Sequence, residues 1–260
     1  MWLPAVITFV GFVTGLSPLE PGGPCRIEHY GGREGLLVRM EEHVRDARGR
    51  ATESVVRQGS RLDVLERTNR RFDRGSRLSL ETTRRWLVEQ RRWEKEVVRH
   101  RWDAAGREVA EERRTGSGPT AILRHEYDAQ GRRVTTIALA GRRPLTSTNY
   151  RYDAQGRLAA EDYGPAGGPP TWTITYTYGS QGRLLSQASP MVGTTTFEHD
   201  EAGRVVRELT LAADGRRVQD VRRTYDTKGR EVERVVVAAV VGGDETRRTR
   251  FDYNCPPPLR

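Results

Sequence analysis

Hydrophobic and polar residues alternate along much of the chain, which is the pattern of β-strands that bury one face. The clearest run is TWTITYTY at 171–178, where alternate positions are threonine. Its large apolar and aromatic side chains all fall on the other side: Trp172, Ile174, Tyr176 and Tyr178. We expect this aromatic side to be core and the threonine side to face solvent.

A short motif separates the alternating runs: an aromatic residue, Asp, two variable residues, Gly and Arg. The hexapeptide YDAQGR occurs at 127–132 and again at 152–157. A third copy that matches the motif fully begins at Tyr225. Further copies vary the first residue, lose the Asp or shift the Gly, and they begin at 45, 72, 102, 178 and 199. Phe251-Asp252 is taken as the start of the last copy. The residues that carry this structural turn motif are Trp102, Asp103, Gly106, Arg107, Tyr127, Asp128, Gly131, Arg132, Tyr152, Asp153, Gly156, Arg157, Asp200, Gly203, Arg204, Tyr225, Asp226, Gly229 and Arg230.

Each part of the motif has a physical role in a tight turn. The Asp side chain accepts hydrogen bonds from backbone amides two residues on. The two variable residues take right-handed turn angles, and Gly then adopts a positive φ that a Cβ would disfavour. This order is a type I turn followed by a left-handed residue, a common hairpin loop. Every copy therefore predicts a hairpin, with the aromatic residue ending one strand and Arg opening the next.

A second, looser set of Gly- and Pro-rich breakers lies between the copies, as at 115–119, 164–170 and 189–193. The repeated unit is thus strand, tight turn, strand, variable turn. We predict an all-β fold, an antiparallel meander of about sixteen or seventeen strands, curled into a sheet or partial barrel with its last strand near its first. Residues 84–94 stay open between helix and strand, because Trp86, Trp93 and Val97 have helix-like spacing.

The repeated unit resembles the YD repeat of Rhs-type proteins, whose signature is close to Tyr-Asp-x-x-Gly-Arg. The resemblance covers residues 45–253. It implies long antiparallel sheets that wind into shells, which enclose a toxin domain in Rhs and Tc toxins and serve adhesion in teneurin-like proteins. This chain has eight units and ends in NCPPPLR. We therefore expect a stand-alone repeat region without a toxin domain, with export and a non-catalytic role.

The two ends of the chain add a targeting segment and two cysteines. The first sixteen residues carry no charged side chain, so residues 1–17 are expected to be a secretory signal, with an uncleaved anchor or a misplaced start as alternatives. Residues 18–44 would form N-terminal strands, and 45–260 the repeat sheet. In an oxidising compartment Cys25 and Cys255 could pair, which would stabilise the fold by roughly 5 kcal/mol. Two unrelated thiols are the alternative.

Composition and charge bear on partners. Charged residues make up 30% of the chain, the formal net charge is +9, and only Lys95 and Lys228 are lysines. Arginine suits carboxylates, phosphates and aromatic faces, so the surface could attract a polyanion. Alternatively, Arg merely occupies a fixed repeat position and protects strand edges. Similarly, aromatic rings beside Arg could stack on sugars or bases, or simply form the core.

Catalytic and metal-binding motifs do not emerge from the sequence. The histidines are scattered, at 29, 43, 100, 125 and 199, and no HExxH, GxSxG or P-loop occurs. His199 takes an aromatic position of the motif, which favours packing. We predict no catalytic residue, no metal site and no cofactor.

The expected function is an exported, non-enzymatic repeat protein for binding or scaffolding, secreted, periplasmic or at the cell envelope or surface. Its partner would be a protein or an acidic glycan, hence carbohydrate binding; nucleic acid is less favoured, and no stable membrane span is expected. One alternative is a shell fragment of a toxin system that shields an effector. Another is a basic binder of polyanions, including nucleic acid.

Overall fold

The structure, a computed structural model, describes residues 22–31, 35–59, 61–240 and 243–254. Within these ranges every regular element is a β-strand, and all pairings are antiparallel. The strands are Arg26–Gly31 (β1), Leu36–Arg45 (β2), Ala51–Gln58 (β3), Asp63–Phe72 (β4), Leu78–Leu87 (β5), Arg92–Trp102 (β6), Glu108–Thr115 (β7), Ala121–Tyr127 (β8), Arg133–Ala140 (β9), Arg143–Tyr152 (β10), Leu158–Pro165 (β11), Trp172–Tyr178 (β12), Leu184–Ser189 (β13), Gly193–His199 (β14), Val205–Leu211 (β15), Arg217–Tyr225 (β16), Glu231–Val240 (β17) and Gly243–Asp252 (β18).

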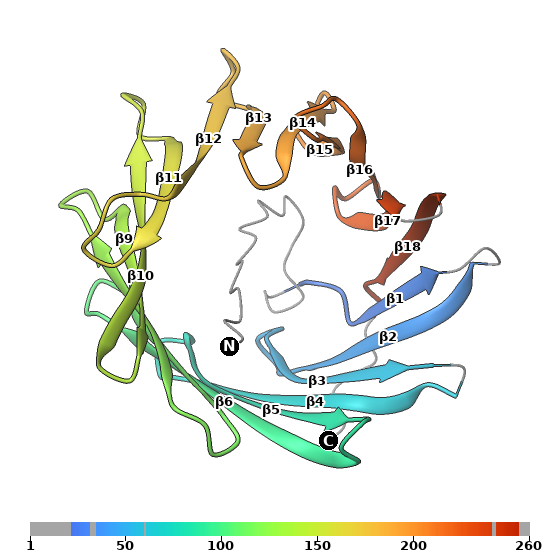
Figure 1. The fold of residues 1–260 in the computed structure, drawn as a ribbon. Coiled ribbons are helices and arrows are strands. Elements are labelled where there is room, and N and C mark those ends of the chain that lie inside the picture. Colours follow the sequence, from blue (N-terminus) through green and yellow to red (C-terminus); the bar gives the residue numbers. More distant parts are fainter. Residues whose placement is uncertain (1–21, 32–34, 60, 241–242, 255–260) are drawn as a thin grey trace.

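Each strand pairs with its neighbours in sequence, and β1 also pairs with β18, so the sheet closes on itself (Figure 1). Arg26 lies opposite Asp252 on one side and opposite Glu42 on the other. The predicted meander of hairpins is therefore confirmed, and its closure makes it a barrel. Closure removes both free edges, which an open sheet of this size would have to protect.

The described residues form 18 strands, slightly more than the predicted sixteen or seventeen. The repeats account for β3 to β18, and the chain before residue 46 adds both β1 and β2. The ambiguous stretch 84–94 is also settled as strand, since β5 and β6 are joined by a tight turn there. Trp86 lies directly opposite Trp93, with ring centroids 5.6 Å apart. Hairpin pairing, and not a helix, brings these two rings together.

The two faces of the sheet differ sharply in burial. One face holds most of the buried side chains, including His43, Ser54, Thr68, Thr83 and Val98. The first four lie directly opposite one another across β2 to β5, and Val98 lies on the same face of β6. Side chains converge on the concave face of a closed sheet and diverge on its convex face. We therefore call the face with these residues the inward face and the opposite one the outward face.

Strand β12 confirms the prediction for TWTITYTY. Tyr176 is buried on the inward face, while Thr175 and Thr177 on the other face are exposed. Trp172 is half-buried and stacks on Tyr163 of β11, with ring centroids 3.9 Å apart. The aromatic side is core, as predicted, although the inward face as a whole is more polar than a usual core.

Candidate functional site

The tight turns have the predicted geometry. In the turn at 103–107, the Gly106 N–H donates to the Asp103 carbonyl at 3.1 Å, and the Asp103 N–H donates to the Arg107 carbonyl at 2.9 Å. Gly106 has a φ of +81°. The same left-handed corner recurs at Gly49, Gly131, Gly156, Gly182, Gly203 and Gly229. In the shifted copy the corner falls on Ser76 (φ +65°), because Gly75 comes one position early.

The Asp of each complete motif holds the Arg four residues later. Asp103 Oδ1 accepts the Arg107 backbone N–H at 2.9 Å, and Oδ2 accepts Arg107 Nε at 2.7 Å. The backbone hydrogen bond, followed by the side-chain one, lowers the pKa of Asp103. The same pair of bonds recurs in other copies: Asp46–Arg50, Asp73–Arg77, Asp128–Arg132, Asp153–Arg157, Asp200–Arg204 and Asp226–Arg230.

The Arg of one motif also covers the aromatic ring of the next. Arg107 lies 4.9 Å from the centroid of the Tyr127 ring, and Arg132 lies 4.8 Å from that of Tyr152. The Tyr127 hydroxyl donates back to the Glu108 carbonyl at 2.6 Å. We call this chain of Asp, Arg and ring contacts the turn ladder. Further steps join Arg50 to Phe72, Arg157 to Tyr178, Arg204 to Tyr225 and Arg230 to Tyr253.

The last step corrects the assignment of Phe251 as the final aromatic anchor. Arg230 lies 4.4 Å from the centroid of Tyr253, and the Tyr253 hydroxyl donates to the Glu231 carbonyl at 3.0 Å. Tyr253 thus makes both contacts of an anchor. Phe251 instead lies on β18 opposite Ile27, where it helps to close the barrel. The sequence alone favoured Phe251 because an Asp follows it directly, whereas Tyr253 is followed by Asn254.

The seam beside Tyr253 contains Cys25. Its backbone N–H donates to the Asp252 carbonyl at 2.8 Å, and the His43 N–H donates to the Cys25 carbonyl at 2.8 Å. Cys25 is buried and disulfide-bonded. Cys255, the other cysteine of the sequence, lies outside the described residues, as does the expected signal at 1–17.

One step of the turn ladder departs from the rest. Gly179 replaces Asp, so Arg183 donates instead to the carbonyls of Asp200 and Glu201, both at 3.2 Å. His199 takes the place of the ring beside it. Burial, then the charge of Arg183, lowers the pKa of His199. The histidine therefore tends to be neutral here, in keeping with a packing role.

The outward face of β4 to β7 is strongly basic. Arg67, Arg84 and Lys95 lie directly opposite one another on three neighbouring strands. Like charges in such cross-strand pairs are destabilising, so this row is not explained by stability. We define the basic face as six exposed residues that make no ion pair with a described residue: Arg67, Arg71, Arg84, Lys95, Arg99 and Arg114.

Two further features mark the basic face. Trp86 and Trp93 lie next to Arg84 and Lys95 along the same strands, and Trp93 is 46% exposed. The nearest outward acid on β7 is Glu112, which Arg101 engages at 2.6 Å. An exposed indole ring, paired with a half-buried one and beside unpaired cations, forms a surface suited to sugars that carry negative charge.

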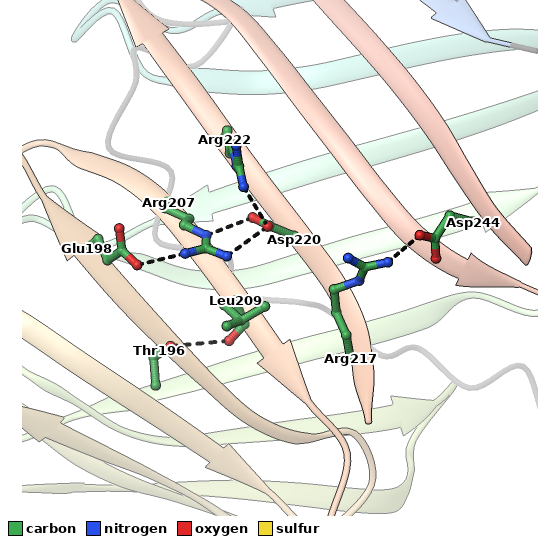
Figure 2. A network of polar contacts seen from close by, with 8 residues as sticks. All are labelled: Thr196, Glu198, Arg207, Leu209, Arg217, Asp220, Arg222 and Asp244. Atoms are coloured by element: carbon green, nitrogen blue, oxygen red, sulfur yellow. Dashed lines mark hydrogen bonds and ion pairs between the residues drawn. The ribbon is translucent and has the colours of Figure 1, made fainter. Parts of the chain in front are cut away.

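The opposite wall uses its arginines differently (Figure 2). Arg207 on β15 donates two hydrogen bonds of 3.0 and 2.9 Å to the Asp220 carboxylate on β16, and Arg222 donates another to it. Glu198 on β14 contacts Arg207 at 3.1 Å. Charges on this wall are balanced within the sheet. The contrast shows that the basic face is a local feature and not a general consequence of the +9 charge.

The inward face carries clusters of polar side chains that the sequence did not reveal. Glu161 is 1% exposed and accepts hydrogen bonds from the hydroxyls of Tyr163 and Tyr176. Burial, then the bond to Glu161, raises the pKa of both tyrosines. His100 Nδ1 lies 2.6 Å from Glu108 Oε1. Such clusters join residues of different strands, so only the register of the barrel shows them.

Comparisons with known proteins give likenesses of fold only. No protein-family model and no curated protein matches the sequence. The Tc toxin structure TcdB2-TccC3 is 14% identical over 82% of this chain, with a TM-score of 0.39. The Tc holotoxin pore of Photorhabdus luminescens, with the TccC3-D651A mutation, is 11% identical over 89%, with a TM-score of 0.36. This chain spans 12% and 16% of those two chains.

A porin-like protein from Bacteroides uniformis is also similar, with 11% identity and a TM-score of 0.47. The alignment covers 89% of this chain and 99% of that one. At these identities and TM-scores, none of the three likenesses bears on activity. No helix in the described ranges has the length and hydropathy needed to cross a membrane.

Proposed function

We propose that this protein is an exported, non-enzymatic barrel of YD/Rhs-type repeats that binds an acidic glycan at the cell surface or envelope. The basic face carries this proposal. It combines a row of unpaired cations with a tryptophan pair of which Trp93 is exposed, on a wall that the repeat pattern alone does not require to be basic. The proposed membership of the repeat family is supported by the motif and by the turn ladder that it builds.

Binding to this face would combine charge attraction with stacking. Arginine forks engage carboxylate or sulfate groups in pairs of hydrogen bonds, and indole rings cover the apolar faces of sugar rings. Both contributions are available from Arg84 and Trp93, whose strands are directly paired. The strands of this wall are hydrogen-bonded to one another within the closed sheet, so the backbone positions of the cations are set before a ligand arrives.

Binding assays with a sulfated glycan test the proposal. We expect the protein to bind it with an affinity that falls steeply as salt rises, because ion release accompanies each contact. Arg84→Glu combined with Lys95→Glu should weaken binding at least about tenfold. Trp93→Ala should weaken binding to the glycan more than binding to a flexible inorganic polyphosphate.

A matched control uses Arg142 in the turn between β9 and β10 and Arg143 at the start of β10, both exposed and without an ion pair to a described residue. Changing both to Glu alters the net charge equally, so unchanged binding would assign the effect to the basic face. Equal loss in both double variants would refute a specific glycan site. Tighter binding to single-stranded DNA than to the glycan would favour the nucleic-acid alternative.

Export is tested separately. Fractionation and mass spectrometry of the mature N-terminus should find the chain outside the cytoplasm and shortened near residue 17. An intact N-terminus in the cytosol would remove the envelope role while leaving the binding assay unaffected.

The second candidate is a shell component of a toxin system, favoured by the closed wall with a polar inward face. A shell should co-purify with a second polypeptide that the barrel protects from protease. If the barrel purifies without a second polypeptide and still binds the glycan, the shell role is contradicted.

A further inference from the structure

Neighbouring strands bring three metal-ligand side chains together on the inward face. His100 on β6 lies directly opposite Glu111 on β7. A bulge where Trp102 faces Glu108 turns Glu108 to the same side. One ligand atom from each of His100, Glu108 and Glu111 lies within 4.8 Å of the others. These separations suit one small cation after minor side-chain rotations.

A fourth donor stands beside this group on the next strand. His125 on β8 is 7% exposed, and it is close enough to both Glu108 and Glu111 for their charges to act on it. Its Nδ1 lies 3.0 Å from the Thr136 hydroxyl. Such a contact fixes the imidazole ring and leaves Nε2 to serve as a ligand, as is usual for metal-bound histidines.

The carboxylates keep oxygen atoms available. Arg113 engages Glu111 only at Oε1, at 3.0 Å, and it also contacts Glu96 at 3.3 Å. Glu111 Oε2 accepts no hydrogen bond from a described residue, and the same holds for Glu108 Oε2. The carboxylates of Glu96, Glu108 and Glu111 outnumber the two arginines whose charges act on this group, Arg113 and Arg133, so the local charge attracts a cation.

The donor types select the class of metal. Calcium and magnesium prefer sites made of oxygen alone, whereas imidazole together with carboxylate suits zinc and its neighbours among the transition metals. We propose that His100, Glu108, Glu111 and His125 bind one zinc-type divalent cation on the inward face, which clips β6, β7 and β8 together. The site lies on the opposite face of the wall from the glycan-binding surface and does not depend on it.

Metal titration of the untagged full-length chain tests this site. Competition with a chromogenic chelator should show one Zn²⁺ bound per chain, and Co²⁺ in its place should give the visible absorption bands of a tetrahedral site with nitrogen and oxygen ligands. Changing Glu111→Gln, or His100→Gln, should weaken Zn²⁺ binding at least about tenfold. His125→Gln should weaken it and also change the Co²⁺ spectrum.

Two control variants distinguish this site from general attraction of cations. Glu112→Gln removes a carboxylate from the outward face of the same strand, and His29→Gln removes an imidazole that contacts Glu41 elsewhere on the inward face. Both should bind Zn²⁺ like the parent. The proposal is overturned if the parent chain binds no Zn²⁺, or if the control variants lose as much affinity as Glu111→Gln. The Co²⁺ spectrum of the parent decides the question even if a variant fails to fold.

Discussion

At the scale of single residues, the inward face buries groups that a small soluble core would normally exclude. His43 is 8% exposed; its Nδ1 lies 2.7 Å from the Ser54 hydroxyl, and its Nε2 has no hydrogen-bond partner among the described residues. Burial first, and then the charges of Arg70 and Arg45, lower the pKa of His43 to about 4, while Glu41 acts in the opposite direction. A buried imidazole of this kind must stay neutral for the barrel to keep its packing.

This makes the stability of the barrel depend on pH. The pKa of His43 is lower in the folded chain than in the unfolded chain. The stabilisation that neutral His43 gives the fold is therefore fully present above about pH 6.5 and is lost as the pH falls towards 4. The loss amounts to as much as about 3 kcal/mol in the free energy of unfolding. His43→Gln should therefore be less stable than the parent at pH 7, and the difference should shrink by pH 4. Urea unfolding at both pH values measures the difference in the free energy of unfolding between variant and parent. A difference that stays constant with pH would contradict a neutral buried His43.

At the scale of elements, one hairpin turn depends on its glycine. Gly131 has a φ of +79°, so Gly131→Val should lower the free energy of unfolding by about 1–2 kcal/mol. Gln130→Val in the same exposed turn is the control and should have little effect. Thermal melts compare the two, and equal melting temperatures would show that the turn does not need a left-handed residue.

The turn ladder makes a second prediction about elements. Arg132 holds Asp128 with Nε at 2.7 Å and covers the ring of Tyr152. Lysine lacks the planar guanidinium that makes both contacts, so Arg132→Lys should lower the free energy of unfolding by about 1 kcal/mol. Arg142→Lys, in a turn without such contacts, should cost almost nothing. A double-mutant cycle of Arg132→Lys with Tyr152→Leu should show coupling, and strictly additive losses would mean that the ladder is not continuous.

Local chemistry made the hairpins predictable from the sequence. Asp, Gly and Arg at fixed spacing define the turn, and alternation defines strands such as β12. Contacts between copies were not predictable in this way. The stacking of Arg107 on Tyr127, the anchor role of Tyr253 and the cluster at His100 and Glu111 all depend on which residues become neighbours across strands. That register is set by bulges and by closure, which no single repeat encodes.

At the scale of the whole molecule, the short strand β1 closes the barrel, because it pairs with both β2 and β18. Arg45 occupies the position of a ring in the first motif, and its guanidinium donates to the carbonyls of Gly49 and Pro24 at 2.6 and 2.9 Å. Cys25 joins the same seam through the Asp252 carbonyl. The first and last repeats are thus joined through β1, so the closure of the barrel depends on this one strand.

A disulfide between Cys25 and Cys255 would restrain this seam, and its effect should be large. A crosslink between the two ends of the barrel closes nearly the whole chain into one loop, which the entropic treatment of the unfolded state values at roughly 5 kcal/mol. Cys25→Ser combined with Cys255→Ser should therefore lower the melting temperature markedly and expose the β1–β18 pairing to hydrogen exchange before other strands. Reduction of the parent should reproduce both effects, while leaving the double variant unchanged. Uniform loss of protection around all strands would show instead that the barrel opens as a single cooperative unit and that the seam has no special weakness.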